Sequence, residues 1–455
     1  MARMIDAYNL FHRGIEVLAE VERNGLRLDG DYLVNVRKEL SDQIAEVERQ
    51  FTETELYSVW FRTFGSRTNL ASTSQLAKVL FDVMGFKPVR LTDGGKGSVD
   101  EDALELLDLP DVNLLLRARK LRKVRDTYLA QFAREVNDDG FIRPSFSLHL
   151  VRTYRSSSSN PNFQNIPKRD KESLNYVRRA IYPRRGHELV EVDFSAIEVI
   201  VSTFYHKDPE MIRYVTQPDA DMHADMAKQI FCLTHLDKKD PSQALLRQAA
   251  KNGFVFPQFY GDYYKSCARH LLNWIELPTQ GVFKSGTGVT LNGSPIADHL
   301  RSVKLNTAEA FTDHIRRVEE DFWGRRFRVY GDWKRRWVAE YRKRGYLRML
   351  TGFVVAGPLR DNEITNYPIQ GTAFHILLRT IIHLHDFLSS KGMDTRLVGQ
   401  IHDSMVLDAN PDEVDEVVGA IRDIVARLPE EWPWVIVPLE VEVERFGRDM
   451  PWVKV

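Results

Sequence analysis

Strand-like segments occur in two parts of this chain that lie far apart, and this separation constrains the fold more than any other feature. HELVEVDFS (187–195) is an apolar segment of strand length, and most of the others, GFVVAGPL, RLVGQIHDSMVLDA and VIVPLEVEVE, come only in the last third. The residues between them, from about 205 to 325, are mainly helical in periodicity. An antiparallel sheet that carries helical insertions is therefore predicted, in an α+β protein.

The composition excludes several other classes of protein. No run of about 18 apolar residues is present, so no membrane span is expected. The two cysteines, Cys232 and Cys267, form no CxxC pair, which argues against a disulfide framework or a zinc site and favours a cytoplasmic protein. The length of 455 residues is too great for one simple core and indicates two or three subdomains.

The distribution of charge says more than its sum. The formal net charge is only −1, but three segments are strongly basic: 117–125, 178–185 and 325–348. One such run is typical of a solvated helix face. Three runs interleaved with Tyr and Trp favour contact with phosphates instead.

Two aspartates end apolar strand segments about 210 residues apart. Asp193 closes LVEVDFS, and Asp403 lies in QIHDSMVLD, where a short polar tip between apolar residues resembles a hairpin. Either residue alone is typical of a cap or a turn. On two strands of one sheet, however, they could bring two carboxylates together, and oxygen-rich pairs of this kind bind magnesium.

Five segments, in order along the chain, resemble motifs of the family A DNA polymerases, the DNA polymerase I type, with details closest to the bacteriophage members. They are TYRSSSSNPNFQNIP (primer-strand loop), VDFSAIEVIVSTFYHKD (motif A), RQAAKNGFVFPQFYG (motif B), NYPIQGTA (the segment before motif C) and QIHDSMVLD (motif C). The resemblance implies a right-hand fold with a helical thumb, an antiparallel palm and helical fingers. The expected divisions are a palm-leading segment (1–20), thumb (21–140), first palm part (141–204), fingers (205–330) and second palm part (331–455).

The resemblance also implies template-directed addition of deoxynucleotides to a primer 3′-hydroxyl by two-metal phosphoryl transfer. Two Mg²⁺ ions would be held by Asp193, Asp403 and the backbone carbonyl of Phe194. The matching nucleotide-binding residues are His223, Arg247, Lys251, Glu198, Phe256 and Tyr260, with Arg247 and Lys251 also assisting catalysis. The matching primer-template contacts are Arg155, Asn162, Gln164, Asn165, Gln370 and His402.

Glu198 is the residue expected to distinguish deoxyribose from ribose in the incoming nucleotide. The resemblance places its side chain where a ribose 2′-hydroxyl would lie, beside Tyr260, so deoxynucleotides are the expected substrate. The single-subunit RNA polymerases on the same scaffold carry glycine there. Such an RNA polymerase is one alternative, and a catalytically inactive DNA-binding replisome protein is another.

The sequence also departs from the family pattern. Motif B is one residue longer than usual, so the nucleotide-packing aromatic is Phe256 when counted from Tyr260, whereas position 255 holds Val when counted from Lys251. Because Pro257 cannot donate to the carbonyl of Gly253, a bulge is predicted between residues 252 and 257.

Three further departures concern a single residue, an insertion and a missing motif. Ser404 stands where bacterial members often carry Glu. An insertion is also expected at about 270–325. It could contact the template, contact a partner protein, or be a surface elaboration without a binding role. No acidic exonuclease motif precedes motif A, so no 3′→5′ proofreading is expected from this chain. Replisome proteins or a separate exonuclease are the further partners that this leaves open.

Overall fold

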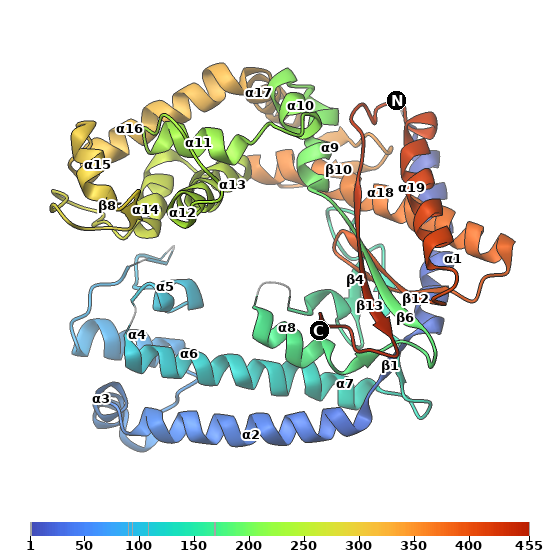
Figure 1. The fold of residues 1–455 in the computed structure, drawn as a ribbon, viewed down its shortest axis with the longest axis horizontal. Helices are drawn as coiled ribbons and strands as arrows, with labels where there is room; N and C mark the ends of the chain where they lie inside the picture. The colour runs from blue at the N-terminus through green and yellow to red at the C-terminus, as the bar shows by residue number, and fades with distance from the viewer. Residues whose placement is uncertain (1, 90, 93, 108, 168–169, 455) are drawn as a thin grey trace.

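The computed structural model describes residues 2–454 except 90, 93, 108, 168 and 169. A central sheet joins two helical parts that extend from it in the same direction and face each other (Figure 1). We call residues 30–135 the helical arm and residues 209–326 the helical lobe. No helix of the described residues is long and apolar enough to cross a membrane.

The central sheet is assembled from the two separated strand regions, as predicted. Its four strands are antiparallel in the order β11 (Arg396–Ile401), β12 (Ser404–Ala409), β6 (Glu188–Phe194) and β13 (Val441–Arg448). Alternate residues of β6 point to opposite faces, so Val190, Val192 and Phe194 enter the main core while Glu191 and Asp193 share the other face.

Helices cover the face of the sheet that enters the main core. α18 (Asp361–Lys391) is the longest helix of the described residues and contacts α1 (Met4–Asn24), α9 (Ile197–His206), α17 (Arg328–Arg344) and α19 (Val414–Glu431). Figure 1 shows α1, α18 and α19 beside the sheet. Because one hydrophobic cluster runs from this layer into the lobe, the sheet and the lobe share a continuous core.

The helical arm has a separate core at its outer end. Its helices are α2 (Gly30–Thr52), α3 (Glu55–Phe64), α4 (Thr73–Ala77), α5 (Glu101–Glu105), α6 (Pro110–Arg122) and α7 (Ala130–Glu135), with π-helical turns at Lys78–Val83 and Lys123–Leu129. The hydroxyl of Ser72 caps α4 by accepting from the Gln75 amide. Phe51, Trp60, Leu76 and Leu115 form the outer core.

The basic run 117–125, which lies in the helical arm, is largely neutralised by neighbouring acids. Four of the six cations in the run 117–125 have an ion pair: Arg117 with Glu172, Lys120 with Asp170, Arg122 with Glu48, and Arg125 with Asp126. The second basic run is likewise used internally, since Arg178 pairs with Glu191 and Arg184 with Asp394. The basic runs in the sequence therefore overstated the cationic surface.

The helical lobe carries motif B. It comprises α10 (Pro209–Thr216), α11 (Met222–Ile230), α12 (Pro241–Ala250), α13 (Phe256–Tyr260), α14 (Tyr264–Trp274), α15 (Ile296–Ser302) and α16 (Ala308–Asp321). The Gly- and Ser-rich segment 281–299 contains a short hairpin, β7 (Thr290–Leu291) with β8 (Ser294–Pro295), and the start of α15.

Small sheets connect these parts. β1 (Leu26–Leu28) pairs with β2 (Phe141–Ile142) and β5 (Ile181–Tyr182) at the base of the arm. β3 (Ser145–Ser147) pairs with β4 (Ser157–Ser159), and β9 (Tyr346–Arg348) with β10 (Val354–Ala356). α8 (Lys171–Arg178) lies between the arm and the sheet (Figure 1).

Candidate active site

The two strand-ending aspartates lie side by side at one end of the sheet. Ser404, the residue after Asp403, is directly opposite Asp193 in the β6–β12 pair. The amide of Phe194 donates to the carbonyl of Asp403 at 3.3 Å. Asp193 and Asp403 are both partly exposed, and the paired strands bring their backbones side by side.

Two sharp turns of the chain lie at this end of the sheet. His402 has φ 52° in the two-residue connection between Ile401 and Ser404, which confirms the predicted hairpin. After Phe194, the chain turns through Ala196, with φ 49°, into α9, whose first turn carries Glu198. Because a left-handed residue reverses the chain within a few positions, Asp193 and Glu198 reach the same region from a strand and a helix.

The donor set suits a hard divalent cation. Among the described residues, no group of three or more His, Cys, Asp or Glu side chains is arranged to hold a metal ion. Mg²⁺, however, usually keeps several waters and binds one or two carboxylates together with substrate phosphates. Asp193 and Asp403 on adjacent strands fit that pattern.

Motif B contains the predicted helix irregularity. Residues Lys251–Val255 form a π-helical turn between α12 and α13, so the predicted bulge is confirmed. The wide turn absorbs the extra residue, and Pro257 follows it at a position where no amide donor is needed. Val255 is buried by this arrangement, whereas Phe256 is partly exposed at the start of α13.

Phe256, Glu198 and Tyr260 line one cavity of about 60 Å³ between the lobe and the sheet layer. This placement favours Phe256 over Val255 as the residue that packs against the nucleotide. Glu198 also receives a hydrogen bond from Arg155 Nη2 at 2.6 Å, an ion pair that the sequence did not reveal. Arg155 and Glu198, predicted separately, are thus brought together.

The predicted triphosphate-binding side chains cluster on α11, α12 and the π-helical turn that follows α12. Arg247 Nε donates to Asp221 Oδ2 at 2.8 Å, and Lys251 Nζ lies 5.2 Å from the centre of the Phe256 ring. Burial would raise the pKa of Asp221, but hydrogen bonds from Arg247 and Lys238 lower it overall. Asp221, which caps α11, is a site residue that sequence reasoning missed.

His223 is held in its neutral form by its surroundings. Burial, together with the charges of Arg247 and Lys251, lowers the pKa of His223 to about 4. Its ring packs edge-on against Phe256 at 5.8 Å, and its buried Nδ1 has no hydrogen-bond partner among the described residues. A neutral imidazole beside two cations can still donate one hydrogen bond to an anionic ligand.

The serine-rich loop is anchored rather than flexible. Gln400 Oε1 on β11 accepts from Ser156 Oγ and from Gln164 Nε2, both at 2.7 Å. Ser158 Oγ accepts from the Phe163 amide at 3.2 Å. These bonds fix the loop to the Asp403 hairpin, and Gln400 is a second residue that the sequence analysis missed.

Several predicted DNA contacts share a groove between the arm and the sheet. A groove of about 690 Å³ is lined by Gln164, Asn165 and His402 from the sheet side. Lys120, Lys123 and Tyr128 line it from the arm. Asn162 is partly buried at the start of this segment, and its Oδ1 has no hydrogen-bond partner in the described part of the chain.

Gln370 is partly exposed on α18, and the glycine after it allows the loop to approach. A Cβ at Gly371 would lie 2.3 Å from the carbonyl oxygen of Thr153 and 2.9 Å from Met349 Cε. Only glycine permits this contact between the helix and the loop backbone.

Replacing Gly371 by Ala is therefore expected to lower the free energy of unfolding by about 1–3 kcal/mol, because the loop must move to admit the methyl group. Thermal unfolding monitored by circular dichroism measures the effect. Gly419→Ala is the matched control, since Gly419 lies in α19 with nothing near its would-be Cβ. Equal melting temperatures for Gly371→Ala and the unchanged protein would contradict the argument.

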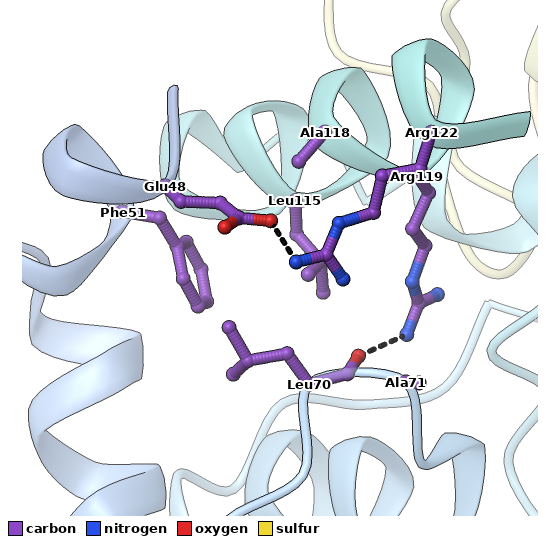
Figure 2. A pocket seen from close by; sticks show the side chains of 8 residues that line it. All are labelled: Glu48, Phe51, Leu70, Ala71, Leu115, Ala118, Arg119 and Arg122. Atoms are coloured by element: carbon purple, nitrogen blue, oxygen red, sulfur yellow. Dashed lines mark hydrogen bonds and ion pairs between the residues drawn. The ribbon is translucent and has the colours of Figure 1, made fainter. Parts of the chain in front are cut away.

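A cavity within the arm has a different character. It has a volume of about 160 Å³. Phe51, Leu70, Leu115 and Ala118 line it, together with four further residues, including Arg119 and Arg122 (Figure 2). Arg119 Nη2 donates to the Leu70 carbonyl at 3.2 Å, and Arg122 pairs with Glu48. None of the predicted site residues lines this cavity, and we interpret it as a packing gap in the outer arm.

Comparison with known proteins agrees with this arrangement. The sequence model of DNA polymerase family A matches residues 31–276 and 335–449, which leaves 277–334 unmatched, in the region predicted to be an insertion. DNA polymerase I of Chloroflexus aurantiacus is 29% identical over 94% of the chain and 41% of the relative. The thermostable DNA polymerase I of Thermus filiformis is 30% identical over 95% of the chain and 46% of the relative. The chain thus spans less than half the length of these relatives.

Among solved structures, the POL domain of Pol1 from M. smegmatis, in complex with DNA primer-template and dNTP, has a TM-score of 0.72 and 25% identity. It covers 97% of this chain, and this chain covers 69% of it. The α+β architecture is accordingly the right-hand polymerase fold. With most of its residues matched by the family model, the chain belongs to DNA polymerase family A.

Proposed function

We propose that this chain is a template-directed DNA polymerase that adds deoxynucleotides to a primer 3′-hydroxyl. The observation that carries the proposal is the pairing of the strands that hold Asp193 and Asp403. Family membership and the primer-template and dNTP of the M. smegmatis structure support the same substrates here. The bacterial relatives support a cytoplasmic location.

The divisions expected from the sequence are retained as part of this proposal. The helical arm corresponds to the thumb (21–140) and the helical lobe to the fingers (205–330). The sheet and its covering helices correspond to the palm (141–204 and 331–455), led by residues 1–20. The groove between the arm and the sheet would then hold the primer-template duplex.

Asp193, Asp403 and the backbone carbonyl of Phe194 would hold the magnesium ions. Mg²⁺ bound there would lower the pKa of the primer hydroxyl and neutralise charge on the triphosphate. Arg247 and Lys251, one helical turn apart, would bind the triphosphate and offset the charge that develops on pyrophosphate.

His223, kept neutral by its low pKa, would donate a hydrogen bond to a phosphate oxygen. Asp221 would hold the Arg247 guanidinium in place before a nucleotide arrives, since their side chains are already bonded. Phe256 would stack on the incoming base, as aromatic side chains commonly do.

Contacts to the duplex would be shared between the anchored loop and the hairpin. Arg155, Gln370 and His402 would reach the minor groove at the primer end, where every correct pair offers acceptors at similar positions. Asn162, Gln164 and Asn165 would contact the backbone. Such contacts test the shape of a base pair without reading its sequence.

We also propose that editing is absent from this chain, because its described segments all belong to the arm, the lobe and the sheet region. Primer extension on a matched and a mismatched template, with Mg²⁺ and either deoxy- or ribonucleotides, tests both proposals. Extension of the matched primer by deoxynucleotides is expected, with no shortening of the mismatched primer. Extension by ribonucleotides alone would indicate an RNA polymerase, and binding without extension would indicate an inactive DNA-binding protein.

A further inference from the structure

A buried ion pair lies beside the two aspartates. Arg178, at the end of α8, donates from Nη1 to Glu191 Oε2 at 2.7 Å and from Nη2 to Oε1 at 3.4 Å. Both residues are buried, and the guanidinium lies 3.9 Å from the centre of the Trp452 ring. Glu191 is two residues before Asp193 on β6, so both side chains are on the same face of the sheet.

One serine connects this pair to the second aspartate. Ser404 is fully buried, follows Asp403 and lies opposite Asp193 on β12. Its hydroxyl is 3.2 Å from Glu191 Oε1 and 3.0 Å from the carbonyl of Ile401, and it can donate to either. Glu191 is therefore linked through a single hydroxyl to the strand that follows Asp403.

We propose that Glu191, fixed by Arg178, is a positioning residue of the polymerase site. It takes the place of the glutamate that bacterial members often carry where this chain has Ser404. The Glu191 carboxylate comes from the strand of Asp193 instead of the strand of Asp403, and the Ser404 hydroxyl connects the two strands by its hydrogen bond to Glu191. The inference rests on the proposed function, because it concerns the geometry and charge around the same two aspartates.

The charge balance explains why a carboxylate is needed here. Removing one partner of a buried ion pair leaves the other charge uncompensated. Without Glu191, the positive charge of Arg178 would remain near Asp193 and weaken the attraction of the aspartates for a divalent cation. Glu444, opposite Glu191 on β13, is engaged by Lys454 at 2.6 Å and does not replace it.

A reciprocal exchange tests the proposal with three variants: Glu191→Ser, Ser404→Glu and the double variant. Primer extension is measured against Mg²⁺ concentration, Mn²⁺ binding to the DNA-free protein by electron paramagnetic resonance, and stability by thermal unfolding. Glu191→Ser is expected to lower kcat and Mn²⁺ affinity by about 10–100-fold, as loss of a supporting residue near a metal typically does. The double variant is expected to recover most of both, because the carboxylate returns from the other strand.

A double variant no better than Glu191→Ser would overturn the proposal. So would a Glu191→Ser protein that melts earlier but keeps its kcat and Mn²⁺ affinity, since the pair would then be structural only. If Glu191→Ser does not fold, Glu191→Gln keeps the volume and the acceptor for Ser404 while removing the charge, and unchanged Mn²⁺ affinity in it would be equally decisive. Failure of the unchanged protein to extend primers would contradict the proposed function, whereas the Mn²⁺ comparison would still test this inference.

Discussion

Replacing Asp193 by Asn is expected to lower the rate of primer extension by a factor on the order of 10³ or more. The amide keeps the shape of the side chain but loses the negative charge, and several kcal/mol of transition-state stabilisation depend on a bound divalent cation. Single-turnover extension of a labelled primer at saturating nucleotide measures the loss. Affinity for primer-template, measured by fluorescence anisotropy, is expected to change little, because phosphate contacts spread over the groove dominate it.

The control for this variant is Glu440→Gln. Glu440 is an exposed carboxylate at the same end of the sheet, and only its backbone carbonyl contacts Ser195. Full activity is expected from it. Substantial extension by Asp193→Asn would remove Asp193 from the proposed metal site, and a similar loss in both variants would point to a general disturbance of the sheet end.

The sheet and the motif B bulge were predictable because their causes are local. The apolar runs around Asp193 and on both sides of Asp403 predict buried strands, and the two polar residues between Ile401 and Ser404 predict a tight hairpin. Pro257 lacks an amide donor for the carbonyl of Gly253, which favours a departure from regular α geometry in the helix before it. Each feature follows from a few neighbouring residues, and the structure has all of them.

The pairing of charged side chains was not predictable in the same way. Asp221 with Arg247, Arg155 with Glu198, and Arg178 with Glu191 join residues that are 13 to 43 positions apart. A charged residue at an alternating strand position, such as Glu191 in LVEVD, is usually taken to face solvent. Glu191 is buried because the folded chain places Arg178 and Trp452 next to it, and nothing in the hydrophobic periodicity of its own strand indicates this burial.

The basic runs show the same limit of prediction from sequence, because cations that were expected at the surface are paired within the protein. Arg117, Lys120 and Arg122 were expected to meet phosphates, yet each has a carboxylate partner within the protein. Lys123 lines the groove that also contains His402, and Lys120 lines it as well despite its ion pair. A count of charges along a helix cannot separate these cases, because the acids that neutralise the cations come from α2 and α8.

Replacing Glu198 by Ala is expected to reduce the preference for deoxy- over ribonucleotides by about 100-fold, the scale on which a shaped pocket rejects one added hydroxyl. Glu198 lines the cavity shared with Phe256 and Tyr260, so truncating it opens space at the predicted position of the 2′-hydroxyl. The ratio of kcat/KM values for dNTP and rNTP on one template measures the change.

Glu198→Gln separates volume from charge in this prediction. The amide has nearly the same size as the carboxylate, but it weakens the ion pair with Arg155. If the side chain excludes ribose by occupying space, Gln keeps most of the selectivity and Ala loses it. If both variants lose selectivity equally, the ion pair must hold the side chain in its excluding position, and Arg155→Ala should then reproduce the loss. Full selectivity in Glu198→Ala would instead assign recognition of the sugar to another residue of the cavity.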